Sequence, residues 1–229
     1  MGSVNVGVFC GTFNPIHLGH LHLARSVQRL FGLEQIHFVV ATAPPHKPLE
    51  ELVPFIHRYA MVSLATAGRR SFAPSLAELD DPSSPFSLHT MAKFARRQAG
   101  TTSSLYFVAG GDSLLDVGGW HESGELLATY NFIFAARAGV PVLDAAAILP
   151  PDVLRRIRDL RGLGARELRA GIRAERYAAE NRIFIVDVGA PDISASRIRS
   201  LVASGQPIDD LVPPAVRHYI DKLHLYGER

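Results

Sequence analysis

The chain has 229 residues, of which 47% are hydrophobic, and its formal net charge is only +2. This length suffices for one α/β domain with a sizeable core, and the charge is too small to indicate nucleic-acid binding. The single cysteine, Cys10, excludes an intramolecular disulfide framework and is typical of a reducing compartment. Because neither a signal peptide nor a membrane-spanning stretch is visible, we expect a cytoplasmic protein with no membrane partner.

Strands and helices alternate along the whole chain. Hydrophobic periodicity and Gly or Pro breaks predict strands at 4–9, 35–41, 71–79, 105–109, 131–136 and 183–188. The same signals predict helices at 17–31, 55–67, 88–98, 114–127, 151–160 and 166–180, and the stretch 114–127 is expected to be interrupted at Gly118-Gly119. This alternation predicts an α/β fold with a doubly wound, Rossmann-like parallel sheet. We expect one domain, 1–229, with a helical C-terminal part from about residue 190.

The turn after the first strand has the features of an anion site. Gly11 ends the strand, and a helix is expected to begin near His17. Free backbone N–H groups and the positive end of the helix dipole would then point at the same place. His17 and His20 lie on one helical face, and Gly19 between them leaves room for a ligand to approach the backbone. Imidazoles beside a phosphate site indicate donors to a transferring phosphoryl group.

A zinc site built from His17, His20 and His22 is the alternative interpretation. These histidines lack the i, i+4 spacing that is usual for helical zinc ligands, and no carboxylate or cysteine cluster is nearby. We therefore expect no metal site made by the protein itself.

A second helix N-terminus is expected after the last strand. Ser194 is placed as the N-cap of this helix, and Ser196 and Arg199 lie near its start at i, i+3 spacing. A helix dipole, a hydroxyl and a guanidinium would then converge on one anion. An ordinary capped surface helix is the alternative for this stretch taken alone.

Two motifs connect these features to a known superfamily. Residues 11–20 resemble the signature of the nucleotidyltransferases with the HxGH motif, although Cys10 and Asn14 stand where the pattern often has Gly and Asp. Residues 193–199 resemble the superfamily's second signature, ISxSxxR, which holds the β- and γ-phosphates of ATP.

Further matches are Pro45-His46-Lys47, Gly111-Asp112, Trp120 and, in the C-terminal pattern, Leu225-Tyr226. With these matches, the whole chain resembles the bacterial nicotinate-nucleotide adenylyltransferase family. That resemblance implies adenylyl transfer from ATP to nicotinate mononucleotide, giving nicotinate adenine dinucleotide and pyrophosphate in NAD biosynthesis. Phe86 and His89 depart from the family's tyrosine and acidic residue, and the element that begins at Arg137 lacks the family's proline.

The resemblance and the local chemistry together imply the site residues. Catalytic roles are expected for His17, His20, Lys47 and Arg199. ATP is expected to lie against Gly11, Thr12, Phe13, Gly19, Ile193, Ser194 and Ser196. The pyridine mononucleotide is expected to lie against His46, Phe86, Ser87, Gly111, Asp112, Trp120, His121 and Arg137. Mg²⁺ is expected to arrive with ATP.

Several of these residues have plainer interpretations. Lys47 lies in a proline-stiffened loop at a strand's end, but a loop lysine is often only solvated. Asp112 is also a favoured type of helix N-cap, and Trp120 is a residue type common in cores. The arginines between 155 and 182 are interpreted as a solvated basic face.

Other functions stay open from the residues alone. The acceptor could be nicotinamide mononucleotide, phosphopantetheine or a polyol phosphate, and a cytidylyl group could replace the adenylyl group. A non-catalytic nucleotide sensor on the same fold is a further option. An RNA-binding module based on the arginines of 155–182 lacks interleaved aromatic residues, so we expect no nucleic-acid partner. The oligomeric state is left open, with a homodimer as one option.

Overall fold

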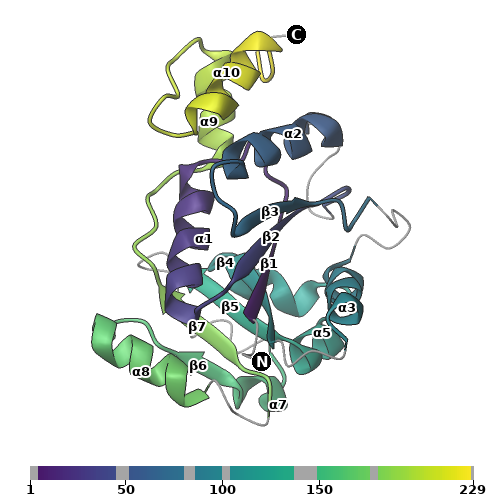
Figure 1. Cartoon of the computed structure of the whole chain (residues 1–229), viewed down its shortest axis with the longest axis vertical. Helices are drawn as coiled ribbons and strands as arrows, with labels where there is room; N and C mark the ends of the chain where they lie inside the picture. The colour runs from purple at the N-terminus through teal and green to yellow at the C-terminus, as the bar shows by residue number, and fades with distance from the viewer. Residues whose placement is uncertain are drawn as a thin grey trace. The chain divides into compact units, whose positions relative to one another are not determined.

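The computed structural model describes residues 5–44, 52–79, 86–99, 104–136, 149–175 and 180–227. Its strands form one seven-stranded sheet with the order β3-β2-β1-β4-β5-β7-β6 (Figure 1). The strands are β1 (Asn5–Gly11), β2 (Gln35–Val40), β3 (Phe72–Ser75), β4 (Ser104–Gly110), β5 (Asn131–Ala136), β6 (Ile157–Asp159) and β7 (Ile183–Asp187). β4 pairs with β1 and β5, and β7 pairs with β5 and β6, all in parallel. The predicted α/β fold with a doubly wound parallel sheet is confirmed.

Helices connect these strands, as parallel pairing requires. They are α1 (Leu18–Phe31), α2 (Phe55–Thr66), α3 (Ser87–Arg97), α4 (Ser113–Asp116), the 3₁₀ turn η2 (Val117–Gly119), α5 (Ser123–Thr129), α7 (Pro151–Leu154), α8 (Ala165–Glu175), α9 (Ala195–Ala203) and α10 (Pro214–Lys222). Within the described ranges, no helix has both the length and the apolar character needed to cross a membrane.

The chain divides into two compact units. Unit 1 comprises Met1–Phe9, Leu23–Ile36 and Phe86–Ala190. Unit 2 comprises Cys10–His22, His37–Pro85 and Pro191–Arg229. A single domain over 1–229 stays a prediction.

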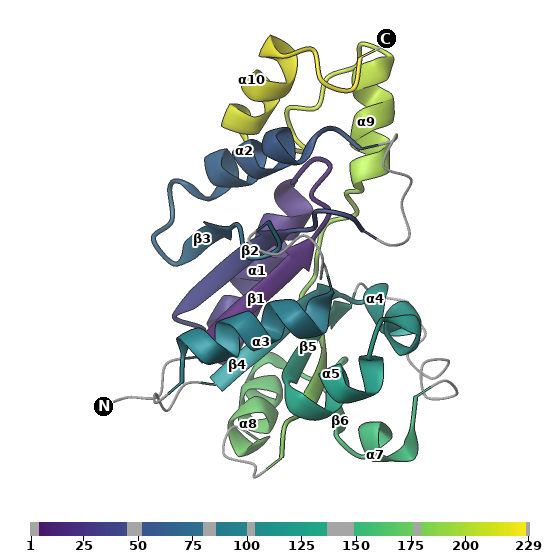
Figure 2. The same cartoon turned by 90° about the vertical axis from the view of Figure 1, so that its right-hand side faces the viewer.

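Unit 1 has a core of stacked aromatic residues. Phe132 lies between Phe107 and Phe134, with ring centroids 5.0 and 5.5 Å away, and all three are buried. Phe31 of α1 packs edge-on against Phe184 of β7 at 5.1 Å. The helices α3 and α5 lie side by side (Figure 2). Continuous burial along β5 and β7 is typical of parallel strands that are covered on both faces.

Unit 2 is built around α2, which packs against β3 and α10 (Figure 1). A chain of rings joins its first turn to its strands, because Phe38 contacts Phe13 at 5.9 Å and Phe72 at 5.2 Å. The helices α9 and α10 supply the C-terminal part that was expected to be helical from about residue 190.

Two predicted elements were wrong in extent. The helix expected at 151–160 ends at Leu154, and Ile157 instead starts an edge strand that pairs with Ile183. Pairing with β7 outweighs local helix propensity there. The strand expected at 71–79 ends at Ser75. The interruption expected at Gly118-Gly119 in the helical stretch 114–127 is confirmed, because the 3₁₀ turn η2 lies there between α4 and α5.

Candidate active site

The first turn of unit 2 is shaped by a buried phenylalanine. Phe13 has a left-handed backbone, with φ of 47°, and only 2% of it is exposed. Its ring packs edge-on against His20 with centroids 5.1 Å apart. A Cβ added at Gly11 would lie 2.8 Å from that ring, so glycine is required there. Gly11 therefore serves the turn by making room for Phe13.

The two motif histidines hold each other in place. Their rings stack with centroids 3.6 Å apart and an angle of 26° between planes. The backbone N–H of His17 donates to Nδ1 of His20 at 3.2 Å, and that of His20 donates to Nδ1 of His17 at 3.4 Å. Since both Nδ1 atoms accept, the neutral rings carry their proton on Nε2. This tautomer makes each Nε2 a donor suited to an anionic oxygen.

Gly19 allows the two sequence motifs to approach each other. A Cβ added at Gly19 would lie 3.0 Å from Nδ1 of His17 and 3.6 Å from the Cβ of Ile193. Any side chain here would push against the His17 ring, which is itself buried. The glycine of the first motif thus makes room for a residue of the second.

Free backbone N–H groups were expected at the start of α1, but some of these amides are already hydrogen-bonded within the protein. The N–H of Leu18 donates to the carbonyl of Leu211 at 2.9 Å, and that of His20 donates to the His17 ring. The protein uses these groups to fix the turn. The dipole of α1 still favours negative charge near this end.

The second motif caps α9 and reaches the first motif. The Oγ of Ser194 accepts from the N–H of Arg197 at 3.2 Å, as expected of an N-cap, and Ser196 is exposed beside it. The Nη1 of half-buried Arg199 donates to the carbonyl of Asn14 at 3.0 Å, across 185 positions of sequence. Both phosphate motifs therefore lie in unit 2 and touch directly.

Arg58 of α2 also holds this turn in place. It was assigned no role from the sequence. It is 2% exposed, and its Nη1 donates to the carbonyls of Thr12 at 2.9 Å and Ala41 at 2.6 Å. Its Nε donates to the carbonyl of Val53 at 3.1 Å. Burial lowers the pKa of Arg58 from its ordinary value, which is high enough that the guanidinium stays charged. Its position on the apolar face of α2, three residues before Met61, was the available signal.

Asn14 is the junction of this network. Its Oδ1 accepts from the hydroxyl of Tyr226 at 2.9 Å and from the N–H of Val53 at 3.4 Å, and its side chain is almost fully buried. Burial raises the pKa of Tyr226, and the charges of Arg199 and Arg58 only partly oppose this. The hydroxyl therefore stays protonated and acts as the donor.

Cys10, which follows the buried part of β1, has no sign of reactivity. Burial, and secondarily the charge of Glu78, raises the pKa of its thiol well above the ordinary value. Glu78 is itself held by the N–H of Thr42, which donates to it at 3.0 Å. A protonated thiol is a poor nucleophile, so Cys10 acts as a packing residue.

In unit 1, the residues expected to contact the pyridine nucleotide form an exposed aromatic group. Phe86 stacks on His121 with centroids 4.0 Å apart, and Nε2 of His121 lies 3.3 Å from the carboxylate of Glu122. The same carboxylate lies 4.0 Å from Nε2 of His89. Trp120 is half-buried and packs edge-on against Phe107 at 5.7 Å, which leaves part of the indole accessible.

The polar residues assigned to the acceptor lie at two ends of elements in unit 1. Ser87 begins α3 directly after Phe86. The N–H of Gly111 donates to the carbonyl of Ala135 at 2.8 Å, which fixes the end of β4. Asp112 is exposed and its side chain makes no capping bond to α4, so the plainer N-cap interpretation is wrong. His46, Lys47 and Arg137 lie outside the described residues.

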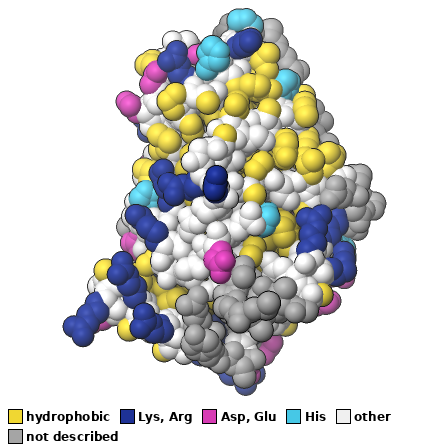
Figure 3. Space-filling view, in the orientation of Figure 1, with side chains coloured by type: hydrophobic (Ala, Val, Ile, Leu, Met, Phe, Trp, Pro, Cys, Tyr) yellow, Lys and Arg dark blue, Asp and Glu magenta, His cyan; other side chains and the backbone are white. Residues whose placement is uncertain are grey.

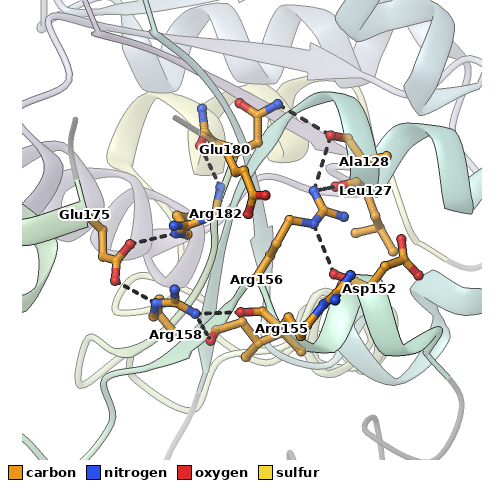
Figure 4. A network of polar contacts seen from close by, with 12 residues as sticks. Leu127, Ala128, Asp152, Arg155, Arg156, Arg158, Glu175, Glu180 and Arg182 are labelled. Atoms are coloured by element: carbon orange, nitrogen blue, oxygen red, sulfur yellow. Dashed lines mark hydrogen bonds and ion pairs between the residues drawn. The ribbon is translucent and has the colours of Figure 1, made fainter. Parts of the chain in front are cut away.

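The arginine-rich segment is more than a solvated face. Arg156 is buried, and its Nη1 donates to the carbonyl of Leu127 at 2.6 Å (Figure 4). Arg158 and Arg182 both donate to Glu175, at 2.7 and 2.6 Å, and these bonds lower the pKa of the Glu175 carboxyl. The interpretation as a solvated basic face fits the exposed arginines, among them those of α8, where basic side chains gather in Figure 3.

In the part of the chain that the structure describes, no three His, Cys, Asp or Glu side chains are grouped so that they could hold a metal ion. The donors around the first turn are imidazoles, a guanidinium and backbone groups. These are suited to phosphate oxygens rather than to a hard cation.

The chain is similar to known proteins along almost its whole length. The family model for cytidylyltransferase-like proteins matches residues 8–201, a range that includes both motifs. The probable nicotinate-nucleotide adenylyltransferase of Pelobacter propionicus is 37% identical over 98% of this chain and 99% of its own. The chain belongs to the nicotinate-nucleotide adenylyltransferase family. Another member, from Geobacter sulfurreducens, is 35% identical over 98% of this chain and 99% of its own.

Solved structures support the fold of this adenylyltransferase family member. Plasmodium falciparum nicotinic acid mononucleotide adenylyltransferase complexed with NaAD superposes with a TM-score of 0.67, at 17% identity and with 97% of each chain covered. A putative nicotinate-nucleotide adenylyltransferase from Vibrio parahaemolyticus gives a TM-score of 0.61 at 13% identity, with 99% of this chain and 97% of that chain covered. The family resemblance inferred from the motifs is confirmed.

Proposed function

We propose that this chain transfers the adenylyl group of ATP to nicotinate mononucleotide, forming nicotinate adenine dinucleotide and pyrophosphate in NAD biosynthesis. The observation that carries the proposal is the bond from Arg199 to the Asn14 carbonyl, which joins the two phosphate motifs beside the stacked histidines. Relatives that match along almost the entire chain bear the name of this activity.

The reaction needs placement and charge stabilisation more than proton transfer. An oxygen of the acceptor's 5′-phosphate attacks the α-phosphorus of ATP and forms the new P–O bond. The bond from the α-phosphorus to the bridging oxygen breaks, and pyrophosphate leaves with that oxygen. The attacking oxygen is already anionic, so no general base is required, and in-line positioning supplies much of the rate.

The histidines supply the donors for the charge on the reacting phosphate. Their Nδ1 atoms accept backbone N–H groups, so Nε2 of His17 and of His20 can donate to α- and β-phosphate oxygens. Because the rings are held before substrate arrives, little reorganisation is needed during the reaction. Thr12 and Phe13 line the same turn through their backbone.

The leaving pyrophosphate is assigned to α9. The guanidinium of Arg199 and the exposed hydroxyl of Ser196 lie near the helix start, where the dipole favours an anion. Mg²⁺ bound with ATP would neutralise part of the phosphate charge. Since the donors named here include no carboxylate, phosphate oxygens rather than this turn would hold the ion. We assign a further neutralising role to Lys47.

The acceptor's pyridine ring is assigned to the aromatic group of unit 1. Phe86, Trp120 and His121 offer ring faces or edges, and Asp112 and Ser87 offer polar atoms beside them. His46, Gly111 and Arg137 complete the proposed acceptor contacts. Both substrates are soluble metabolites, which supports a cytoplasmic location.

A substrate panel tests the proposal. Pyrophosphate release is measured with ATP or CTP against nicotinate mononucleotide, nicotinamide mononucleotide, phosphopantetheine and glycerol 3-phosphate, with the product identified by mass spectrometry. We expect ATP with nicotinate mononucleotide to give by far the highest kcat/KM. A preference for any other pair would contradict the proposal, and ATP binding without release for any acceptor would favour a nucleotide sensor.

A further inference from the structure

The segment after α10 makes a polar contact with the turn between β1 and α1, which is called the phosphate turn below. The hydroxyl of Tyr226 donates to Oδ1 of Asn14 at 2.9 Å, a contact between residues 212 positions apart. Tyr226 lies beyond residues 8–201, so it is not part of the broad family pattern that contains both motifs. The backbone here is unusual, because His224 and Tyr226 have φ angles of 49° and 66°. Non-glycine residues adopt such angles only where their surroundings hold them.

Asn14 passes this contact on to the phosphate-binding arginine. Its side-chain oxygen accepts from Tyr226, and its backbone carbonyl accepts from Nη1 of Arg199 at 3.0 Å. Oδ1 also accepts a longer bond, at 3.4 Å from the N–H of Val53. The tyrosine hydroxyl makes the shorter of these two bonds, and it holds the residue whose carbonyl meets Arg199.

We propose that Tyr226 is a positioning residue for ATP: its hydroxyl fixes Asn14, and Asn14 in turn holds the Arg199 guanidinium where it meets the triphosphate. The proposal rests on the proposed function in one respect, namely that Arg199 binds phosphate. Tyr226 itself touches neither ATP nor the acceptor in this scheme.

A positioning role of the Tyr226 hydroxyl can be distinguished from a packing role of its ring. Tyr226 and Arg199 line the same cavity of about 500 Å³, together with residues of α2 and α9. Replacing Tyr226 by phenylalanine keeps the ring that lines this cavity and removes only the hydroxyl. The change therefore alters the Asn14 bond while leaving the volume of the packed ring nearly the same.

A matched pair of hydroxyl deletions tests the proposal. Tyr219 of α10 provides the control, because its hydroxyl bonds to Nδ1 of His57 at 3.0 Å and makes no contact with Asn14. We expect Tyr226→Phe to lower kcat/KM for ATP about tenfold, the loss typical of one buried hydrogen bond, with the KM for nicotinate mononucleotide changed less than about twofold. Tyr219→Phe should leave both parameters near the wild-type values. Equal losses for both substrates, or equal losses in both variants, would indicate a merely structural role.

Substitutions at Asn14 test whether Tyr226 affects ATP binding through Asn14. Asn14→Asp keeps an acceptor oxygen for the hydroxyl, so it should lose less ATP affinity than Asn14→Leu. In the Asn14→Leu background, Tyr226→Phe should cause no further loss, because the two residues act through one bond. Additive losses would overturn the proposal.

Direct binding separates this proposal from the proposed function. Calorimetry with a non-hydrolysable ATP analogue should show about tenfold weaker binding to Tyr226→Phe than to the wild type. If the wild type transfers adenylyl to no acceptor but this difference persists, the proposed function fails and the positioning role stands. Unchanged analogue binding and turnover in Tyr226→Phe, or no analogue binding by the wild type, would overturn the positioning role.

Discussion

The phosphate turn of unit 2 and the aromatic group of unit 1 are built in different ways. In unit 2, His17, Asn14 and Arg58 are buried, and each side chain bonds to a backbone group. In unit 1, His121 and Asp112 are exposed, and Phe86 stacks on the exposed His121 ring. Stabilising charge in a transition state requires donors fixed in advance, whereas a flat ring can be bound by partly exposed side chains.

The hydrogen-bond acceptors of the two buried or half-buried arginines in unit 2 add to this contrast. Arg58 and Arg199 donate to backbone carbonyls. These bonds tie the two guanidinium groups to the backbone of the turn, so a change that removes or shifts one of them also disturbs the turn. We therefore expect substitutions in unit 2 to affect catalysis strongly and those in unit 1 to affect the acceptor moderately.

The largest effect is expected for His20→Ala. The change removes an Nε2 donor and the ring that stacks on His17, so kcat should fall about 10²–10³-fold. Steady-state kinetics with both substrates checks this, with His218→Ala as a control because His218 is exposed on α10. Near-normal turnover in His20→Ala would remove the histidines from the mechanism.

A smaller effect is expected for Arg199→Ala. Loss of a charge-assisted bond to pyrophosphate oxygens should raise the KM for ATP about 10- to 100-fold. Arg197→Ala is the matched control, since Arg197 is exposed on the same helix and uses only its backbone N–H in the cap. If the two variants bind ATP equally well, α9 does not hold the triphosphate.

In unit 1, Trp120→Ala should raise the KM for nicotinate mononucleotide about 3- to 10-fold while leaving that for ATP unchanged, because ring stacking contributes about 0.5–1.5 kcal/mol. Trp120→Phe keeps a ring and should recover part of the loss. A lower melting temperature with an unchanged acceptor KM would show that Trp120 serves only to pack against Phe107.

The smallest effect concerns stability in unit 1. The bonds from Arg158 and Arg182 lower the pKa of Glu175, so their stabilisation is present above the unfolded value of about 4.3 and is lost as pH falls through the folded value. Glu175→Gln should lower the free energy of unfolding by about 0.5–1 kcal/mol at pH 7. Urea unfolding at pH 7 and pH 3 measures the difference.

At pH 3 the wild type and Glu175→Gln should approach each other in stability. A difference that persists at pH 3 would indicate lost packing instead of lost charge. Glu180→Gln is a control with a smaller expected effect, since the Glu180 side chain is 72% exposed and its contact with Arg182 is longer.

Local sequence signals predicted most strands, their parallel pairing and the cap at Ser194. They failed at 157–159, where pairing with β7 creates a strand inside a helical pattern. Both phosphate motifs were also predicted to lie at helix starts. This prediction needs only the spacing of residues that are close in sequence. Whether particular amides were open could not be inferred, because the partner of Leu18 is Leu211, far along the chain.

Arg58 and Tyr226 show the same limit. Arg58 lies on an otherwise apolar helix face, which indicated burial but did not indicate that Thr12 and Ala41 would accept its bonds. Tyr226 matched a C-terminal family pattern but had no spacing relation to Asn14. Contacts between residues so far apart depend on the fold as a whole.

The bond between Arg199 and Asn14 also has a consequence for how the protein is made. It closes a loop of 185 residues, so a chain emerging from the ribosome carries the first motif long before its partner exists. A nascent chain that stops short of residue 199 lacks the residue to which we assign the leaving pyrophosphate. Competence for adenylyl transfer is thus expected late in synthesis, after all seven strands of the described sheet have been translated.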